Sequence, residues 1–195
     1  MSLRRYEICG GIASGKTTFC QGLENQGYAP IFENFQKNPF FEDFYDDPVS
    51  YSFETEITFL LQHYNLIKKQ SNRTTPIITD YSLVLDMAYA DINLTGDRQR
   101  IFFEIVTELE KEIGLPDKII HLDCSEEILL ERIIRRSRDA ETSITLDYLR
   151  SLTRAISLRV NNISSKINTF TIDSNAIDFR PGIEGIKGFD QFLAT

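Results

Sequence analysis

The sequence predicts an α/β fold, a parallel sheet of about five strands flanked by helices, on three observations. Short runs rich in Ile, Tyr, Phe and Thr alternate with longer stretches of helical periodicity, which is typical of βαβ units. Three of the runs end in a carboxylate, at Glu33, Asp80 and Asp123, and ligands gather at the carboxyl ends of parallel strands. A glycine-rich segment at residues 10–17 separates the first run from the first helical stretch.

The expected strands, in chain order, cover residues 6–10, 29–33, 76–80, 118–123 and 168–173. Each is a short run of apolar and β-branched residues that is bounded by polar or glycine residues. The fourth run contains His121 between Ile120 and Leu122. We expect this histidine in the core, since strands of parallel sheets are buried on both faces.

The expected helices cover residues 16–26, 50–70, 83–91, 98–112, 125–136 and 145–162. The second of them carries Phe53, Ile57, Leu60 and Tyr64 at helical spacing. The fifth begins at Ser125, which precedes two glutamates, and acidic residues in a first turn complement the helix dipole. From about residue 175 the periodicity is weak and Pro and Gly are frequent, so we expect an irregular tail.

The composition fits one compact domain over residues 1–195, because 42% of the residues are hydrophobic. A net charge of −8 argues against binding to a nucleic-acid polymer or to an anionic membrane. No stretch approaches the ~20 apolar residues of a membrane span, and no apolar leader precedes the first strand. Cys9, Cys20 and Cys124 lie in apolar runs without metal-ligand spacing. We therefore expect reduced, buried thiols in a cytoplasmic protein.

Residues 10–17 satisfy the phosphate-loop pattern G-x-x-x-x-G-K-[ST] between a strand and a helix. In such a loop the backbone N–H groups and the helix start face the phosphates, Lys16 bridges the outer phosphates and Thr17 ligates Mg²⁺. The chain has no G-x-G-x-x-G fingerprint and no obvious guanine signature, so we expect ATP, although GTP stays open. The fold is then of the P-loop NTPase type. The predicted nucleotide-binding residues of this segment are Gly10, Gly11, Ile12, Ala13, Ser14, Gly15, Lys16, Thr17 and Thr18.

The segment after the second expected strand contains Glu33, the pair Asn38-Pro39, and Tyr45 followed by Asp46-Asp47-Pro48. Together with the phosphate loop, it resembles the deoxynucleoside kinase family. The resemblance implies that Glu33 is the base toward the sugar 5′-hydroxyl and that Tyr45 contacts the 3′-hydroxyl. Phosphoryl transfer independently favours a carboxylate near the attacking hydroxyl. The alternative for Glu33 is a solvated surface side chain.

The third expected strand ends in Asp80-Tyr81-Ser82, and Asp86 follows within a helix. This resembles the acidic-Arg-Ser block of the same family and the aspartate that follows it. The resemblance implies that Asp80 helps to hold Mg²⁺ and that Asp86 hydrogen-bonds the nucleobase. A carboxylate at a strand end beside phosphates is also the kind of ligand that Mg²⁺ prefers. The alternative for Asp80 is an N-cap.

Four arginines within seven residues, of which Arg132 and Arg136 share a helix face, stand out in an acidic chain. The segment resembles the family's lid, which closes over the phosphates, and Ser137 replaces its usual glycine. The resemblance implies a mobile lid at about residues 132–141 in which Arg132 and Arg136 are catalytic, Arg136 and Arg138 bind ATP, and Glu141 contacts the sugar. The alternative is a solvated basic helix face.

Three acceptor positions depart from the family pattern. Tyr81 and His63 stand where the family has arginines, and Glu56 stands where it has a glutamine. These positions bind the substrate in the family, so the departures remove two cations from the acceptor side and add a carboxylate. Glu56 and His63 are seven residues apart and should share one helix face that lines the pocket. For His63, a packed helix residue is the alternative interpretation.

The sequence thus predicts an enzyme of nucleotide salvage that uses ATP and Mg²⁺ to phosphorylate the 5′-hydroxyl of a nucleoside-like small molecule. Two alternatives are another P-loop kinase of a small molecule or nucleotide, and a nucleotide-binding protein without turnover. The resemblance also implies a homodimer that forms through the helices at residues 50–70 and 83–91, although apolar stripes of this kind belong to a core more often than to an interface.

Overall fold

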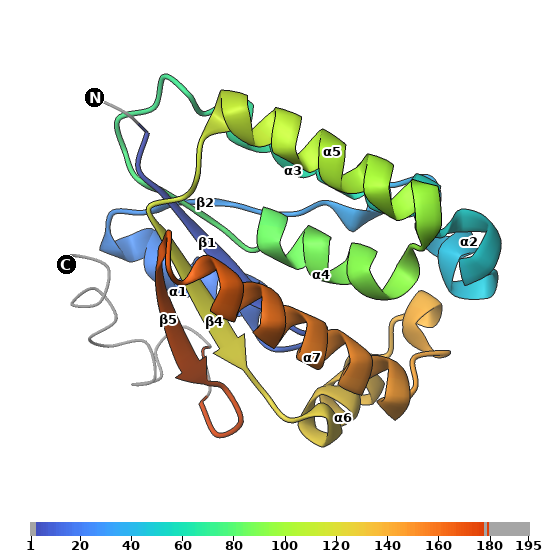
Figure 1. The fold of residues 1–195 in the computed structure, drawn as a ribbon. Coiled ribbons are helices and arrows are strands. Elements are labelled where there is room, and N and C mark those ends of the chain that lie inside the picture. The colour runs from blue at the N-terminus through green and yellow to red at the C-terminus, as the bar shows by residue number, and fades with distance from the viewer. Residues whose placement is uncertain (1–2, 178, 180–195) are drawn as a thin grey trace.

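The computed structural model describes residues 3–177 and Phe179. In this part of the chain five parallel strands form one sheet in the order β2-β3-β1-β4-β5 (Figure 1). The strands are β1 (Arg5–Gly10), β2 (Ala29–Ile31), β3 (Ile77–Thr79), β4 (Lys118–Asp123) and β5 (Asn168–Asp173). Because all pairs are parallel, the carboxyl ends of the strands meet at one edge. The predicted α/β class and number of strands are confirmed.

Strand β2 ends at Ile31, two residues before the expected end. The reason lies in the next hydrogen bonds. The backbone N–H of Glu33 donates to the Oδ1 of Asp80 at 2.7 Å instead of extending the ladder to β3. Glu33 therefore lies in the connection just beyond the strand, at the carboxyl edge of the sheet.

Seven α-helices surround the sheet in the described residues: α1 (Lys16–Leu23), α2 (Phe41–Asp46), α3 (Pro48–Lys68), α4 (Leu83–Asn93), α5 (Gly96–Ile113), α6 (Glu126–Arg136) and α7 (Leu146–Ile163). All but α2 were predicted, with ends that differ by a few residues. Helix α2 was missed because six residues are too few to show helical periodicity. No helix in the described residues is both long and apolar enough to cross a bilayer.

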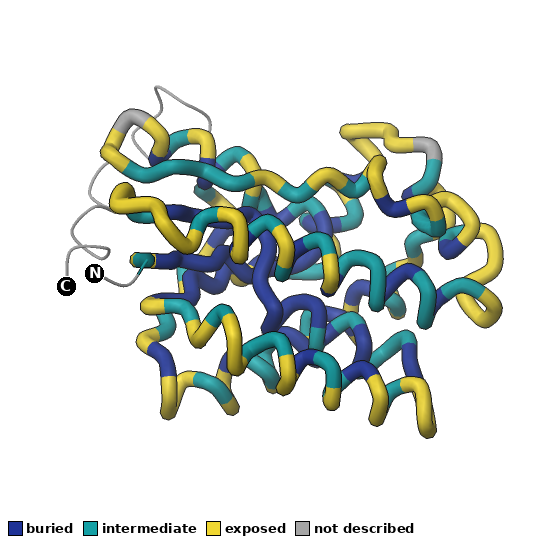
Figure 2. The backbone as a smooth tube through the Cα atoms, turned by 90° about the horizontal axis from the view of Figure 1, so that it is seen from above, coloured by how far each residue is buried: buried dark blue, intermediate teal, exposed yellow. Residues whose placement is uncertain are grey.

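Alternate residues of β1 build two separate cores. Tyr6 and Ile8 lie with α1 residues such as Phe19 in one cluster, whereas Cys9 lies with residues of α4, α6 and α7 in another. This follows from the period of two in a strand. Figure 2 shows the buried stretches in the middle of the molecule and the exposed ones on the outer turns. His121, with 7% of its surface exposed, belongs to this interior, as expected.

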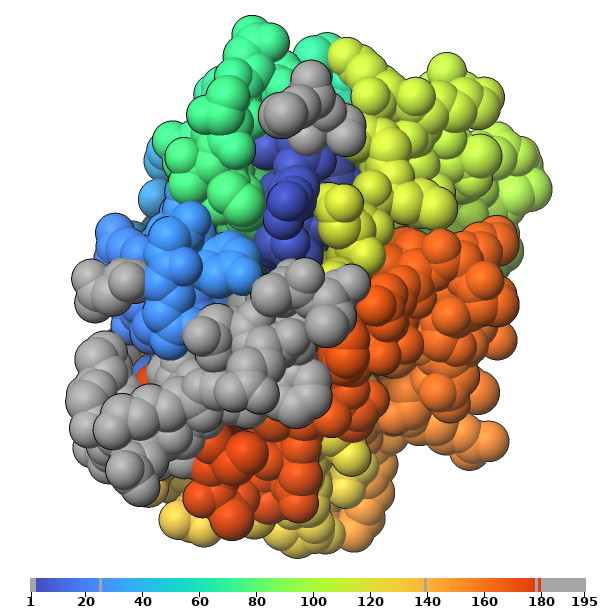
Figure 3. Space-filling model, turned by 90° about the vertical axis from the view of Figure 1, so that its left-hand side faces the viewer, coloured from blue at the N-terminus to red at the C-terminus, as the bar shows by residue number. Residues whose placement is uncertain are grey.

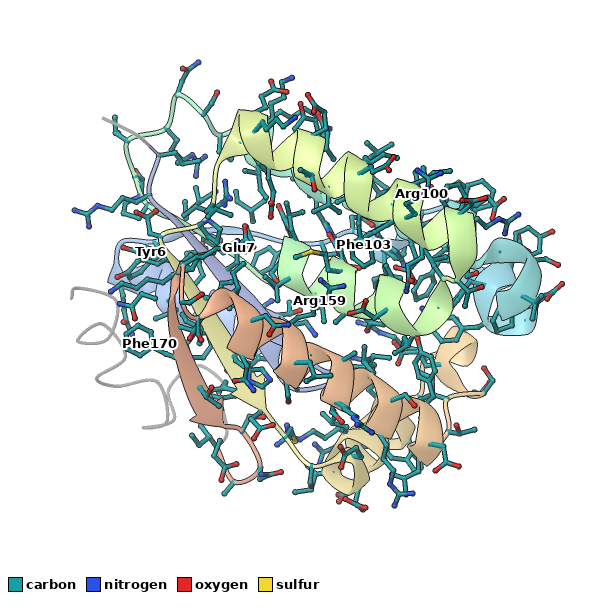
Figure 4. The ribbon with its side chains drawn as sticks, in the orientation of Figure 1. Tyr6, Glu7, Arg100, Phe103, Arg159 and Phe170 are labelled. Carbon is teal, nitrogen blue, oxygen red and sulfur yellow. The ribbon has the colours of Figure 1, made fainter. Side chains whose placement is uncertain are left out.

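Helix α4 is enclosed by the chain itself. Val84 and Ala88 lie in the cluster with α7, and Leu83 and Ala90 in a third cluster with α3 and α5. Across α4, Arg159 of α7 pairs with Asp91 at 2.6 Å and lies over the ring of Phe103 of α5, 4.5 Å from its centroid (Figure 4). The apolar faces of α4 thus pack within the chain itself, and the expected homodimer stays a prediction.

The amino edge of the sheet, on the side away from the phosphate loop, is fixed by one buried ion pair. Arg5 contacts Glu7 at 2.8 Å and donates to the carbonyls of Ile113 and Gly114. A carboxylate oxygen of Glu7 accepts from the N–H of Leu83 at the start of α4. Figure 3 shows the start of β1 between the connections that precede β3 and β4. These contacts hold β1 to α4 and α5, and hence hold the sheet under the helices that carry the acceptor side.

Candidate active site

A cavity of about 330 Å³ lies at the carboxyl edge of the sheet. It is bordered by the phosphate loop, the connections after β2 and β3, helices α2, α3 and α4, and the turn after α6. Its lining residues are Ile12, Ala13, Lys16, Thr17, Glu33, Phe35, Phe41, Phe44, Tyr45, Thr55, Glu56, Phe59, His63, Asp80, Leu85, Asp86, Tyr89, Arg136, Arg138 and Glu141. The structure therefore brings most of the predicted site residues together.

The phosphate loop is shaped by close backbone approach. A Cβ atom at Gly10 would lie 2.8 Å from the carbonyl oxygen of Leu122. Gly15 has a φ of 100°, in the left-handed region, and a Cβ there would meet Phe179. Gly15 is also the N-cap of α1 and offers no side chain to the first-turn N–H groups. Such an uncapped helix start is a site for anions.

Lys16 and Thr17 extend from the start of α1 into the cavity. The Nζ of Lys16 donates to the carbonyls of Gly10 and Gly11, both at 2.9 Å. Burial lowers the pKa of Lys16, and the carboxylates of Glu33 and Asp80 oppose that shift. The loop carbonyls thus hold the ammonium group, and no carboxylate of the described residues forms an ion pair with it.

Asp80 joins the phosphate loop to the connection after β2. Its Oδ2 accepts from the Oγ1 of Thr17 at 2.6 Å, and its Oδ1 accepts from the N–H of Glu33. In the described residues no group of three or more His, Cys, Asp or Glu side chains could hold a metal ion alone. A hydroxyl beside a single carboxylate nevertheless fits Mg²⁺, which commonly takes one or two protein carboxylates and completes its shell with water and phosphate.

Glu33 faces the cavity, with 27% of its side chain exposed. Burial raises its pKa, whereas the charge of His63 lowers it, that of Asp80 raises it and that of Lys16 lowers it. Lys16 and Glu33 thus act on each other electrostatically across the cavity. A carboxylate in this position can accept a proton from a group that attacks a phosphate bound at the loop.

His63 is buried between Asp86 and Tyr81. Its Nδ1 lies 2.9 Å from both carboxylate oxygens of Asp86, and its ring stacks on Tyr81 with 4.1 Å between the centroids. Both interpretations of His63 therefore hold, since it is packed and also lines the cavity. Tyr81 was expected at the substrate, but it is fully buried behind His63 and is not among the lining residues.

Glu56 shares the cavity-facing side of α3 with His63, as predicted. One carboxylate oxygen accepts from the Nδ2 of Asn93 at 2.7 Å, and that amide lies 3.5 Å from the hydroxyl of Tyr148. Burial raises the pKa of Glu56 to about 8; the bond from Asn93 lowers it and the charge of Asp86 raises it. Neither Asn93 nor Tyr148 was predicted.

The arginines of the predicted lid divide into two groups. Arg136 and Arg138 line the cavity and both pair with the buried Glu141, and Arg138 also lies over the ring of Phe35. Arg132 is directed elsewhere: its guanidinium donates to the carbonyl of Ser174, just after β5, at 2.7 Å. The predicted clustering of these cations at the cavity is therefore correct for two of the three.

Aromatic rings form a wall of the cavity that sequence reasoning missed. Phe41 of α2 contacts Phe35, Tyr45 and Phe59 with centroids 5.0 to 6.0 Å apart. The signal was present, because phenylalanine is frequent between residues 32 and 44. A flat apolar wall of this kind suits a planar ring.

The sequence matches the family described as deoxynucleoside kinase over residues 7–184. The chain belongs to the deoxynucleoside kinase family. The reaction of this kinase is accordingly the phosphorylation of a nucleoside, a step of nucleotide salvage.

Individual relatives of the kinase cover most of its length. It is 28% identical to a deoxyguanosine kinase of Bacillus subtilis, with 88% of this chain and 87% of the relative aligned. It is 31% identical to a deoxyadenosine kinase of Dictyostelium discoideum, over 85% and 70% of the two chains. The structure of deoxyadenosine kinase from M. mycoides with bound dCTP superposes with a TM-score of 0.81 at 22% identity, covering 97% of this chain and 98% of the other. That likeness confirms the P-loop NTPase fold.

Proposed function

We propose that the kinase transfers the γ-phosphoryl group of ATP to the 5′-hydroxyl of a deoxynucleoside in this cavity, with Glu33 as the base. The observation that carries the proposal is that Glu33, Lys16 and Asp80 border one cavity. Phosphoryl transfer is mainly a matter of positioning and charge stabilisation, with one carboxylate for the proton of the attacking hydroxyl. The three side chains supply these functions.

The phosphates would bind at the loop and at the first turn of α1. Gly15 leaves the N–H groups there uncapped by a side chain, and the hydroxyl of Ser14 is buried without a hydrogen-bond partner among the described residues. Lys16 would exchange its bonds to the loop carbonyls for bonds to phosphate oxygens. Arg136 and Arg138 would add charge from the opposite side, where Glu141 now holds them.

Thr17 and Asp80 would hold Mg²⁺. They already contact each other through oxygen atoms, the ligand type that this ion requires. The bound ion neutralises charge on the phosphates. Because Asp80 also receives the N–H of Glu33, the same side chain would fix the base relative to the nucleotide.

The acceptor nucleoside would lie against the aromatic wall, with its base edge near Glu56 and Asp86. An ionised carboxylate only accepts hydrogen bonds. Where Glu56 is ionised, above about pH 8, the two carboxylates favour an edge that offers N–H donors, such as that of guanine or cytosine, whereas thymine also needs a donor. We therefore expect purine or cytosine nucleosides to be better substrates than thymidine, with the sugar near Tyr45 and Glu141.

The test is a coupled assay of ATP consumption over a panel of deoxynucleosides, with Lys16→Ala as the inactive control. Deoxynucleoside-dependent turnover by the wild type, lost in a folded Lys16→Ala variant, is the expected result. Turnover only with a monophosphate or another hydroxyl compound would indicate a different acceptor. Nucleotide binding without any turnover would indicate a regulator, and a fully active Lys16→Ala variant would remove the ATP site.

We also propose that the kinase is a cytoplasmic homodimer. Its three cysteines are free and buried, in keeping with a reducing compartment. With α4 enclosed, the exposed Leu61 of α3 and Ile101 of α5 make these two helices the better candidates for the interface. Light scattering of the wild type and of Leu61→Glu would test this: the variant should be monomeric if the wild type is a dimer.

A further inference from the structure

His63 lies between two carboxylates that border the cavity, those of Asp86 and Glu33. On one side its Nδ1 is 2.9 Å from Asp86, and on the other its Nε2 is 3.8 Å from the Oε2 of Glu33. The Nε2 atom is buried and has no hydrogen-bond partner among the described residues. A buried polar nitrogen is costly without a partner, and the nearest acidic group to this one is the carboxylate assigned above as the base.

The orientation of the imidazole is fixed from several directions. Its ring is nearly parallel to that of Tyr81, at an angle of 9°, and it also stacks on Phe59, one turn earlier on α3. Both oxygens of Asp86 hold the Nδ1 edge. A rotation of the ring would break these contacts, so the Nε2 edge stays directed at Glu33.

The charges around His63 favour its protonated form. Burial alone lowers the pKa of His63, but the charge of Asp86 and the hydrogen bond to it, followed by the charges of Glu33 and Asp80, raise it to about 8. A doubly protonated ring has an N–H on both edges. The ionisable groups facing it from the neighbouring elements are Glu56 on α3, Asp86 on α4, Glu33 after β2, and Asp80 and Tyr81 after β3.

We propose that His63, as an imidazolium, is a positioning residue for Glu33, and that Asp86 holds the imidazolium ring in place. The Nδ1–H donates to Asp86, and the Nε2–H, directed at Glu33, keeps the carboxylate of Glu33 turned into the cavity. Glu33 faces the cavity and needs only a small side-chain rotation to shorten 3.8 Å to a hydrogen bond. The inference rests on the proposed function, because it needs Glu33 to be the base.

This arrangement links nucleobase recognition to catalysis. Asp86 has two tasks, since it borders the acceptor cavity and also fixes the histidine that acts on Glu33. A nucleobase group that hydrogen-bonds Asp86 therefore changes the hydrogen bonds between Asp86 and His63. Packing in the core alone does not require the Nε2 of His63 to be directed at a carboxylate of the cavity.

The ion pair can be measured without turnover. The chain has two histidines, His63 and His121, so the ring signals in NMR spectra are assigned with the single variant His121→Gln. We expect the titration midpoint of His63 to fall by about one pH unit or more in Glu33→Gln, because a carboxylate within about 4–6 Å favours the charged imidazole. Glu42→Gln, which removes an exposed carboxylate on α2 outside the cavity, is the matched control and should leave the midpoint unchanged.

The kinetic arm uses His63→Gln, which keeps a hydrogen-bonding side chain but no charge. We expect kcat of His63→Gln to be roughly tenfold or more below that of the wild type while KM for ATP stays constant. We also expect the kcat of the wild type to fall above about pH 8, where His63 loses its charge, and the variant to show no such fall. The proposal would be overturned if His63→Gln had the kcat and the pH profile of the wild type. It would also be overturned if the titration midpoint of His63 were the same in Glu33→Gln as in the wild type. If the wild type phosphorylates no nucleoside, the proposed function fails, and the midpoint in Glu33→Gln still decides whether the two side chains form an ion pair.

Discussion

The Oδ2 of Asp80 accepts a hydrogen bond from the Oγ1 of Thr17 at 2.6 Å, so the third strand of the chain is joined to the phosphate loop of the first. If these oxygens hold Mg²⁺, Asp80→Asn should lower kcat at least tenfold and raise the Mg²⁺ concentration needed for half-maximal rate, since an amide lacks the charge that binds the ion. Initial rates over a Mg²⁺ titration measure both effects.

Asp123→Asn is the matched control for this change. Asp123 also ends a parallel strand, but it is exposed and does not border the cavity. Its variant should keep the rate and the Mg²⁺ requirement of the wild type. Equal effects of the two substitutions, or none from Asp80→Asn, would mean that Asp80 fixes the backbone of Glu33 without binding the ion.

Asp123 also shows that the end of a strand is not enough to place a residue in the site. The pattern of runs predicted β4 (Lys118–Asp123) and β5 (Asn168–Asp173) to the residue, because a period of two and clear boundaries are local properties. The same pattern placed Glu33, Asp80 and Asp123 at one edge of the sheet. Only the strand order, which depends on long-range pairing, shows that Asp123 lies apart from the other two.

The places of Lys16 and Thr17 in the site were predictable, because phosphate binding requires these residue types at a fixed spacing in the sequence. The site was not predictable where a role depends on which side chain is nearest in space. Arg132 satisfies the helix-face argument, yet its guanidinium binds the carbonyl of Ser174. Tyr81 occupies a position next to Asp80, yet a bulky ring there is buried against His63. A shared helix face or a neighbouring position in the sequence predicts where a side chain points only within its own helix or connection.

Glu33→Gln should reduce kcat by roughly 10²-fold or more and leave KM for ATP unchanged, because the amide keeps the shape of the side chain but cannot take a proton. Glu42→Gln, on the exposed part of α2, is again the control and should be fully active. Steady-state rates at saturating nucleoside measure the difference. A change confined to KM for ATP would mean that Glu33 is not the base.

The segment from Arg136 to Glu141 should become more resistant to trypsin when ATP and Mg²⁺ are added. Glu141 now holds both Arg136 and Arg138, and phosphates would add a second anion that binds the same guanidinium groups and orders the segment. Cleavage after Arg73, in the exposed connection before β3, is the internal control and should not slow. Equal rates at Arg136 with and without nucleotide would leave a basic helix end without a lid function.

The carboxyl group of Glu56 is buried, and its pKa is raised from the ordinary value of 4.5 to about 8, chiefly by that burial. A group with a raised pKa binds its proton more tightly in the folded than in the unfolded chain, so its contribution to stability is complete at low pH and is lost as the pH rises towards and past 8. Glu56→Gln cannot ionise. The variant should therefore be more stable than the wild type at pH 9, and the difference in melting temperature should shrink towards pH 5.

The same titration should appear in substrate recognition. One oxygen of Glu56 already accepts from Asn93, so the protonated side chain can donate through the other, as a glutamine would, whereas the ionised side chain only accepts. For Glu56→Gln we expect activity at all pH values and a KM for the nucleoside that no longer changes around pH 8. Above about pH 8 we also expect a smaller preference for purine or cytosine nucleosides over thymidine than in the wild type. Nucleoside KM values of both proteins between pH 6 and 9 test this, and the kcat profile, which depends on His63, separates the two groups. If thymidine is the best substrate of the wild type, or if both proteins show the same pH dependence of KM, Glu56 does not select the base, and the aromatic wall alone sets the preference.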